Sequence, residues 1–145
     1  MNKTPSERVA YLGFATSAAA AGSANTGRIA VANFGRIQVH VRTGAVAAGA
    51  TVSAKLQGSV GVAGDLVDIP GAAITPLAAA ANSNKSAVID LNMDSLARLG
   101  YTHVQLVLTG AGGDAERSAV VLGLDARYGP AYKLDHASVA EIVTV

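Results

Sequence analysis

The chain contains no cysteine and no tryptophan, and only six of its 145 residues are tyrosine or phenylalanine. The lack of cysteine excludes disulfide bonds, thiolate nucleophiles and cysteine-ligated zinc sites. Half of the residues are hydrophobic, but 30 of these are alanine, which buries little apolar area. We therefore expect a lean core for a chain of this length, and association with another protein would stabilise it.

Long hydrophobic runs are also missing. No stretch approaches 18 strongly apolar residues, so we predict no membrane-spanning segment. Residues 9–21 follow two basic residues and have some character of a signal peptide. Gly13, Thr16 and Ser17 interrupt that stretch, and we predict that it is not one. Cleavage near Ala24 would instead indicate a secreted sandwich module.

Alternation of hydrophobic and polar residues is what the chain has in quantity. In residues 36–42 every second residue is a β-branched hydrophobe and the others are polar, which is typical of a half-buried strand. Turn-forming residues separate several such segments, and short strands at this spacing indicate a sandwich or barrel. We predict about eight strands, at 28–33, 36–43, 51–59, 66–69, 86–91, 101–109, 118–127 and 138–145.

The alternation also predicts which side chains face the core. The inward set consists of Ile37, Val39, Val41, Val52, Ala54, Leu56, Val104, Leu106, Leu108, Val120, Leu122 and Leu124. The opposite faces form a polar wall of Gln38, His40, Arg42, Lys55, Gln57, His103, Gln105, Asp125 and Arg127.

The sequence predicts one domain with an N-terminal arm. We expect the arm to span residues 1–24 and to form an edge strand or a short helix. The sandwich domain follows over 25–145, including an apolar C-terminal tail at 131–145. One helical turn is expected at 93–99, where Asn92 or Asp94 can cap the start and Gly100 can end it.

The histidines are the first candidates for a metal site. His40 and His103 fall on outward positions of strands that could be neighbours, so a two-histidine site is conceivable. His136 lies in the tail. No carboxylate stands two residues from His40 or His103 to complete a ligand set, and we predict no metal site.

Other catalytic and cofactor-binding patterns are equally weak. Each pair of nearby carboxylates lies in or beside a turn, where such residues usually cap turns or keep loops soluble. The glycine-rich stretch 110–113 lacks the lysine and helix of a phosphate-binding loop. Basic residues are dispersed and aromatic residues are few, which disfavours nucleic-acid binding. We predict a protein that is not an enzyme, with no cofactor and no nucleic-acid partner. The carboxylate pairs are Asp65 and Asp68, Asp90 and Asp94, and Asp114 and Glu116.

Five segments together carry a resemblance to a known family. They are residues 52–59, 65–75, 87–91, 101–109 and 126–130, and the more specific elements are Lys55-Leu56-Gln57 and Ala126-Arg127-Tyr128-x-Pro130. Over roughly residues 28–130 the chain resembles the small decoration, or cement, proteins of tailed-phage heads. One departure concerns the hairpin after Gln57, which in that family commonly carries Asp-Gly and an aromatic residue. Residues 58–64 have neither, so the resemblance does not predict a contact through this loop.

The resemblance implies a jelly-roll-like antiparallel β-sandwich on the outer surface of the virion. Such a protein is made in the host cytoplasm, binds the assembled capsid and clamps adjacent major capsid protein subunits, often as a homo-oligomer. We expect a dimer in preference to a trimer. Free termini usually fray unless they are tied down, so we expect the apolar termini to carry capsid binding or self-association. The residues are Val9, Tyr11, Leu12, Phe14, Tyr132, Leu134, Val139, Ile142, Val143 and Val145.

The alternative function is a carbohydrate-binding sandwich on a phage particle. Such sites usually stack exposed aromatic rings on sugar faces. Tyr101, Tyr128 and Tyr132 are the candidates for that role.

Overall fold

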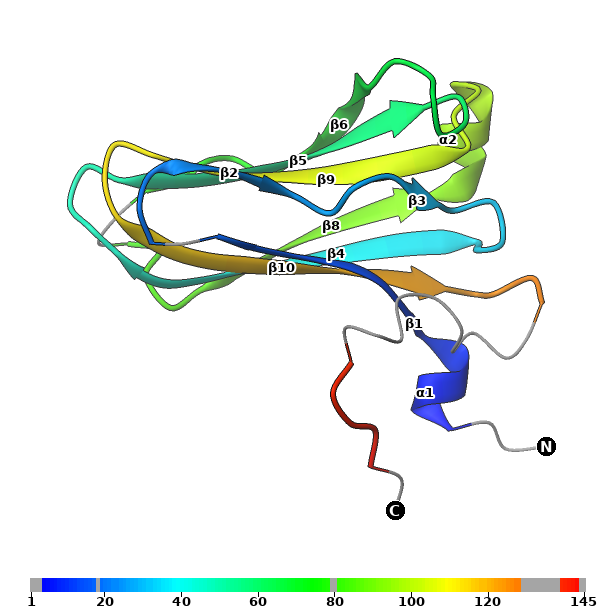
Figure 1. Ribbon diagram of the computed structural model, residues 1–145, viewed down its shortest axis with the longest axis horizontal. Coiled ribbons are helices and arrows are strands. Elements are labelled where there is room, and N and C mark those ends of the chain that lie inside the picture. Colours follow the sequence, from blue (N-terminus) through cyan, green and yellow to red (C-terminus); the bar gives the residue numbers. More distant parts are fainter. Residues whose placement is uncertain (1–3, 18, 79–80, 129–138, 144–145) are drawn as a thin grey trace.

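Two antiparallel β-sheets are stacked in the computed structural model of the chain (Figure 1). It describes residues 4–17, 19–78, 81–128 and 139–143. Sheet A has four strands in the order β1 (Ala10–Ser17), β10 (Ala115–Leu124), β4 (Arg36–Val46) and β8 (Ser86–Asn92). Sheet B has the order β2 (Gly22–Asn25), β9 (His103–Ala111), β5 (Thr51–Ser59) and β6 (Val67–Ala73), with the short strands β3 (Ile29–Ala30) beside β9 and β7 (Leu77–Ala78) beside β5.

The strand order is that of a jelly roll. Leaving out the two-residue strands, sheet A contains the first, eighth, third and sixth strands, and sheet B the second, seventh, fourth and fifth. Among these eight strands, the chain crosses from one sheet to the other at every connection except that between β5 and β6. This double winding is the jelly-roll architecture, and it confirms the predicted fold class.

The predicted strands differ from the observed ones mainly near the termini. The strand expected at 28–33 shrinks to Ile29–Ala30, and the prediction of a strand at 138–145 is wrong for residues 139–143, which are not in a strand. Residues 10–17 and 22–24, which the prediction assigns to the arm, belong to strands of sheets A and B. The division of the chain at residue 24 stays a prediction.

Two short helices complete the described part of the chain. The helix expected at 93–99 is confirmed as α2 (Met93–Arg98), where the Asn92 Oδ1 atom accepts a hydrogen bond of 2.9 Å from the Asp94 N–H. Gly100 follows with a φ of 77°, a left-handed conformation that ends helices at little cost. α1 (Pro5–Arg8) is a single turn before β1. Neither helix is long and apolar enough to cross a membrane.

The core lies between the sheets, and the predicted inward residues of β4, β5 and β9 are all buried. The prediction for β10 is wrong, because its alternation has the opposite phase. Val121 is fully buried, whereas Val120 and its equivalents Leu122 and Leu124 are only half-buried on the outer face. Register explains the difference: Val121 lies opposite Val39 of β4, and residues directly opposite each other share a face.

Gly123 shows why small residues occupy the inner face of β10. Phe34 is fully buried and fills the space above this glycine. A Cβ atom at position 123 would lie 2.7 Å from the Phe34 ring. The volume that a large residue of β10 would have supplied is therefore provided by an aromatic ring from another part of the chain.

Arg117 is a charged residue inside the sandwich. Its side chain points inward from β10 and is only 4% exposed. The guanidinium group donates hydrogen bonds to the carbonyl oxygens of Ala115, Ala20 and Gly22, at 2.8, 3.2 and 2.9 Å. It lies against Gly110 of sheet B, where any Cβ atom would overlap it. Arg117 thus joins the crossing between β1 and β2 to both sheets.

Candidate functional site

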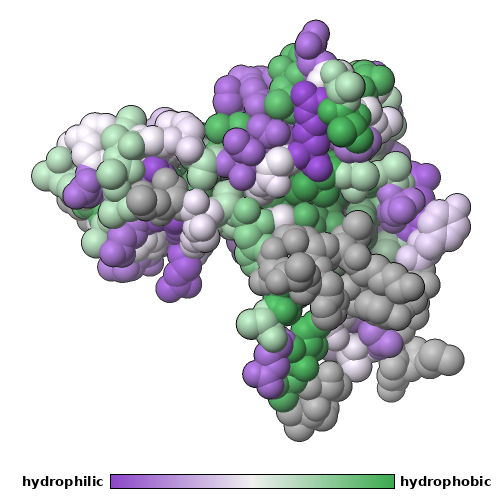
Figure 2. All heavy atoms as spheres, in the orientation of Figure 1, coloured by the Kyte–Doolittle hydropathy of each residue, from purple (hydrophilic) through white to green (hydrophobic). Residues whose placement is uncertain are grey.

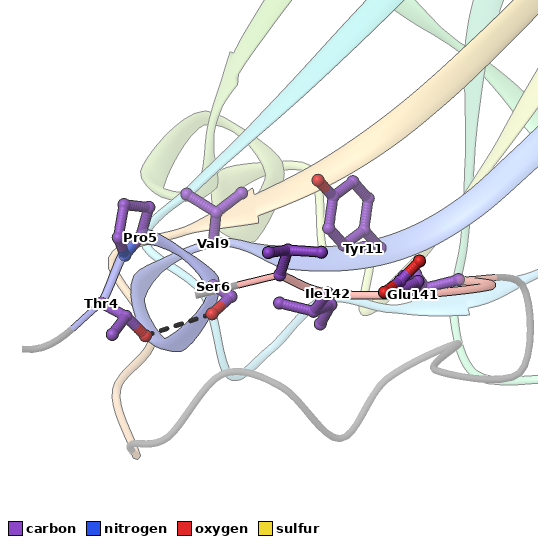
Figure 3. Close-up of a pocket in the computed structure, with 9 residues that line it drawn as sticks. Thr4, Pro5, Ser6, Val9, Tyr11, Glu141 and Ile142 are labelled. Atoms are coloured by element: carbon purple, nitrogen blue, oxygen red, sulfur yellow. Dashed lines mark hydrogen bonds between the residues drawn. The ribbon is translucent and has the colours of Figure 1, made fainter. Parts of the chain in front are cut away.

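A groove lies where the N-terminal and C-terminal segments meet (Figure 3). Its volume is about 630 Å³. Figure 1 places the C-terminal segment, drawn in red, below β1 and beside α1. One side is formed by α1 and the start of β1, and the other by the extended segment 139–143. The residues that line this terminal groove are Thr4, Pro5, Ser6, Val9, Tyr11, Val139, Glu141, Ile142 and Val143.

The first side of the terminal groove is fixed by a capped helical turn. The Glu7 carboxylate accepts hydrogen bonds from the Thr4 N–H at 2.7 Å and from the Thr4 hydroxyl at 3.1 Å. Pro5 occupies the first turn, where its missing N–H has no cost. These features stabilise α1 although it has only four residues, and Val9 connects it directly to β1.

An aromatic pair extends the apolar surface from the terminal groove along β1. The rings of Tyr11 and Phe14 are stacked with centroids 5.9 Å apart and an interplanar angle of 12°. The two residues are three positions apart, and in a regular strand they would face opposite sides. The register of β1 against β10 shifts between Tyr11 and Gly13, and this bulge turns both rings to the outer face of sheet A. Each remains 37% exposed.

The structure brings together six of the ten predicted contact residues. Val9 and Tyr11 share the terminal groove with Val139, Ile142 and Val143, and Phe14 adjoins it through the ring of Tyr11. That these residues bind a capsid or a second copy stays a prediction. Leu12 is an exception, because its side chain is 5% exposed and belongs to the core, so it offers no contact surface. Tyr132, Leu134 and Val145 lie outside the described residues.

Sequence reasoning missed two members of the same surface. Val120 lies opposite Phe14, and Leu122 lies opposite Tyr11, so both are on the outer face beneath the aromatic pair. Alternation alone assigns them to the core, because the run from Ala119 to Leu122 is apolar on both faces of the strand. The pairing of β1 with β10 is the signal that would have placed them correctly, and it depends on tertiary structure.

Two of the three histidines lie within the described residues, and they are far apart in the topology. His40 is on β4 of sheet A and His103 on β9 of sheet B, so the strands that could have been neighbours belong to different sheets. Within the described residues no three histidine, aspartate or glutamate side chains are grouped to hold a metal ion. The His40 ring is hydrogen-bonded instead to the Gln38 side chain at 2.7 Å, and Gln38 donates to Asp90 at 2.8 Å.

The predicted polar wall is divided between the two outer faces. Gln38, His40 and Arg42 are on β4 of sheet A, where His40 lies opposite the exposed Val88 of β8 and β10 separates β4 from the strand of the aromatic pair. The outer face of sheet B is more polar, since it carries Lys55, Gln57, His103 and Gln105. Asp125 and Arg127 follow β10. The two faces of the sandwich therefore differ, and the apolar one adjoins the terminal groove.

Asp68 is held ionised on the outer face of sheet B. The Lys55 ammonium group and the Gln57 amide donate hydrogen bonds to its carboxylate, at 2.8 and 2.7 Å. These bonds, that from Lys55 first, lower the pKa of Asp68 below its ordinary value. The group is exposed, so its ion pair with Lys55 is screened by salt.

The sign of this shift predicts part of the acid sensitivity of the protein. Because the pKa of Asp68 is lower in the folded state than in the unfolded chain, its stabilising effect is present above about pH 4 and is lost as the pH falls further. We expect Asp68→Asn to reduce the dependence of the melting temperature on pH between about pH 5 and 2 at low salt. Asp65→Asn, at an exposed position in the same hairpin, is the control. An unchanged dependence in D68N would contradict the prediction.

The tyrosines proposed for sugar binding lie in different surroundings. Tyr128 is 78% exposed, whereas Tyr101 is half-buried and packs its ring on the Cα atom of Gly58, where a Cβ atom would overlap it. Tyr132 is outside the described residues. Tyr101 therefore has a packing role.

Comparison with known proteins gives distant structural likenesses. No family model and no curated protein matches the chain. A protein of Bacillus endospore appendages, which form disulfide-linked pili, is 12% identical, with a TM-score of 0.39 over 87% of this chain and 98% of that one. A chain of the cowpea mosaic virus top component, a naturally occurring empty particle, is 10% identical. Its TM-score is 0.46, and the match covers 86% of this chain and 85% of that one. A chain of infectious bursal disease virus strain Gx is 12% identical, with a TM-score of 0.42 over 85% of this chain and 34% of that one.

Proposed function

We propose that the protein is a structural component of a virus particle. In this role it decorates the outer surface of a tailed-phage head and clamps adjacent major capsid protein subunits. The observation that carries the proposal is the terminal groove, where exposed Ile142 and Val143 face the start of β1 and continue into the aromatic pair. These apolar side chains contribute little to the isolated sandwich and would be buried by a protein partner.

The jelly-roll fold and the residue chemistry are compatible with this function. Jelly rolls occur in viral capsid domains and in lectins, but a fold alone does not assign a function. The sequence resemblance favours the first class. Assembly on a shell also suits a lean core, because binding to the folded state alone stabilises it by mass action. The same proposal includes a homodimer, a location on the outer surface of the capsid and a role that is not enzymatic.

Co-sedimentation with purified phage heads that lack this protein tests the proposal. We expect the wild-type protein to bind, and Ile142→Asp with Val143→Asp to weaken binding at least tenfold, since burying an uncompensated carboxylate is unfavourable. Val88→Asp is the control, because Val88 is an exposed valine outside the groove. The melting temperatures should stay similar, because all three side chains are exposed.

Two results would contradict the proposal. One is wild-type protein that stays in the supernatant at every head concentration, particularly if it binds glycans instead. The other is a double aspartate variant that binds the heads as tightly as the wild type does.

A further inference from the structure

We propose that the loop between β5 and β6 is a second attachment site, which holds a shell subunit next to the one bound at the terminal groove. This inference rests on the proposed function and deepens it. A protein that clamps two subunits needs two separate contact surfaces on one rigid body. We refer to residues 59–64 as the valine loop.

Exposed aliphatic side chains gather at the valine loop and beside it. Val60 is 64% exposed and Val62 is 72% exposed, and Val67 and Leu99 on the flanking elements β6 and α2 are 48% and 46% exposed. Val67 lies opposite Gly58 at the base of the hairpin, and Leu99 ends α2, close to the Thr102 that binds the loop. Figure 2 shows hydrophobic atoms at this end of the molecule and again on the C-terminal segment.

The valine loop is held in place by hydrogen bonds. The hydroxyl of buried Ser59 donates to the Gly61 carbonyl at 2.9 Å, and the Gly61 N–H donates to the Thr102 hydroxyl at 2.9 Å. The Arg28 guanidinium group donates to the Val62 carbonyl. The loop therefore presents its two valines in a fixed arrangement.

Fixed valines are well suited to binding. Valine has a stiff side chain that loses little rotamer freedom when it is buried, and an ordered loop avoids part of the entropy cost of association. Neither Val60 nor Val62 belongs to the core, so the fold does not explain why they are hydrophobic. Burial against a binding partner would explain it.

The position and size of the patch favour an added contact with a protein that is already bound at the terminal groove. Figure 1 places the valine loop beside α2, on the side of the sandwich away from α1 and the C-terminal segment. Four partly exposed aliphatic side chains offer a few hundred Å², less than the roughly 800 Å² per partner of a stable interface. The patch is thus too small to hold a second copy of this chain by itself. It suffices as an added contact for a protein already bound elsewhere, because the second contact is then intramolecular.

Val60→Ser combined with Val62→Ser tests the inference. We expect the variant to melt within about 2 °C of the wild type, since both side chains are exposed. Its affinity for heads should fall about tenfold or more as avidity is lost. At saturating concentration the variant should still occupy the heads. It should no longer raise their thermal disruption temperature, because it binds one subunit only. Val88→Ser is the matched control.

The outcomes separate this inference from the proposed function. If V60S/V62S binds and stabilises heads as the wild type does, while I142D/V143D does not bind, the second site is wrong and the proposed function stands. If the wild-type protein does not bind heads at all, the proposed function itself fails. If V60S/V62S only abolishes self-association measured by sedimentation without heads, the loop joins copies of this chain and the inference is overturned.

Discussion

Replacing Arg117 with methionine is expected to lower the free energy of unfolding by about 3 kcal/mol, because each buried carbonyl oxygen that loses its hydrogen bond costs about 1 kcal/mol or more. Methionine fills a similar volume but cannot donate hydrogen bonds. The carbonyl oxygens of Ala20, Gly22 and Ala115 would lose the hydrogen bonds that the guanidinium group gives them inside the protein. Urea denaturation followed by circular dichroism measures the loss.

Arg36→Met is the matched control for Arg117→Met. Arg36 forms an ion pair of 2.7 Å with Asp125, but both side chains are more than half exposed. Solvent and salt screen such pairs, so R36M should unfold at nearly the wild-type urea concentration. Equal losses in R117M and R36M would show that the buried hydrogen bonds of Arg117 have no special importance.

Val121→Ala and Val120→Ala are expected to differ strongly although they make the same chemical change at adjacent positions. Val121 is fully buried between the sheets, so its truncation removes buried methyl groups and leaves a cavity, at a cost of about 2 kcal/mol. Val120 is half-buried on the outer face, and V120A should cost less than half as much. Urea denaturation of both variants checks the assignment. A larger loss of stability in V120A than in V121A would show that Val120 faces the core, as sequence alternation predicted.

The difference between β10 and the other central strands shows what alternation can predict. In β4 polar residues stand between Ile37, Val39 and Val41, so only one face can be buried. In β10 the run from Ala119 to Leu122 is apolar on both faces, and periodicity does not choose between them. Pairing with β4 decides the matter, and strand register is a property of the fold.

The candidate site was predictable in composition but not in arrangement. The apolar character of both termini is visible in the sequence. Their meeting in one groove depends on tertiary structure, and so does the bulge that brings Tyr11 and Phe14 to one face. Arg117 looks like an ordinary surface residue in sequence, because the carbonyl oxygens of Ala20 and Gly22 that bind it are almost a hundred positions away.

The pairing of β1 with β10 has a consequence for synthesis of the protein. During translation β1 is made before β10, its only strand partner within the described residues. Sheet A therefore cannot close until synthesis has passed β10, and such non-local pairing makes folding slow, in milliseconds to seconds. The surface that includes Tyr11 and Phe14 takes shape only in the finished fold. A nascent or truncated chain would thus be unable to compete with complete molecules for the same partner.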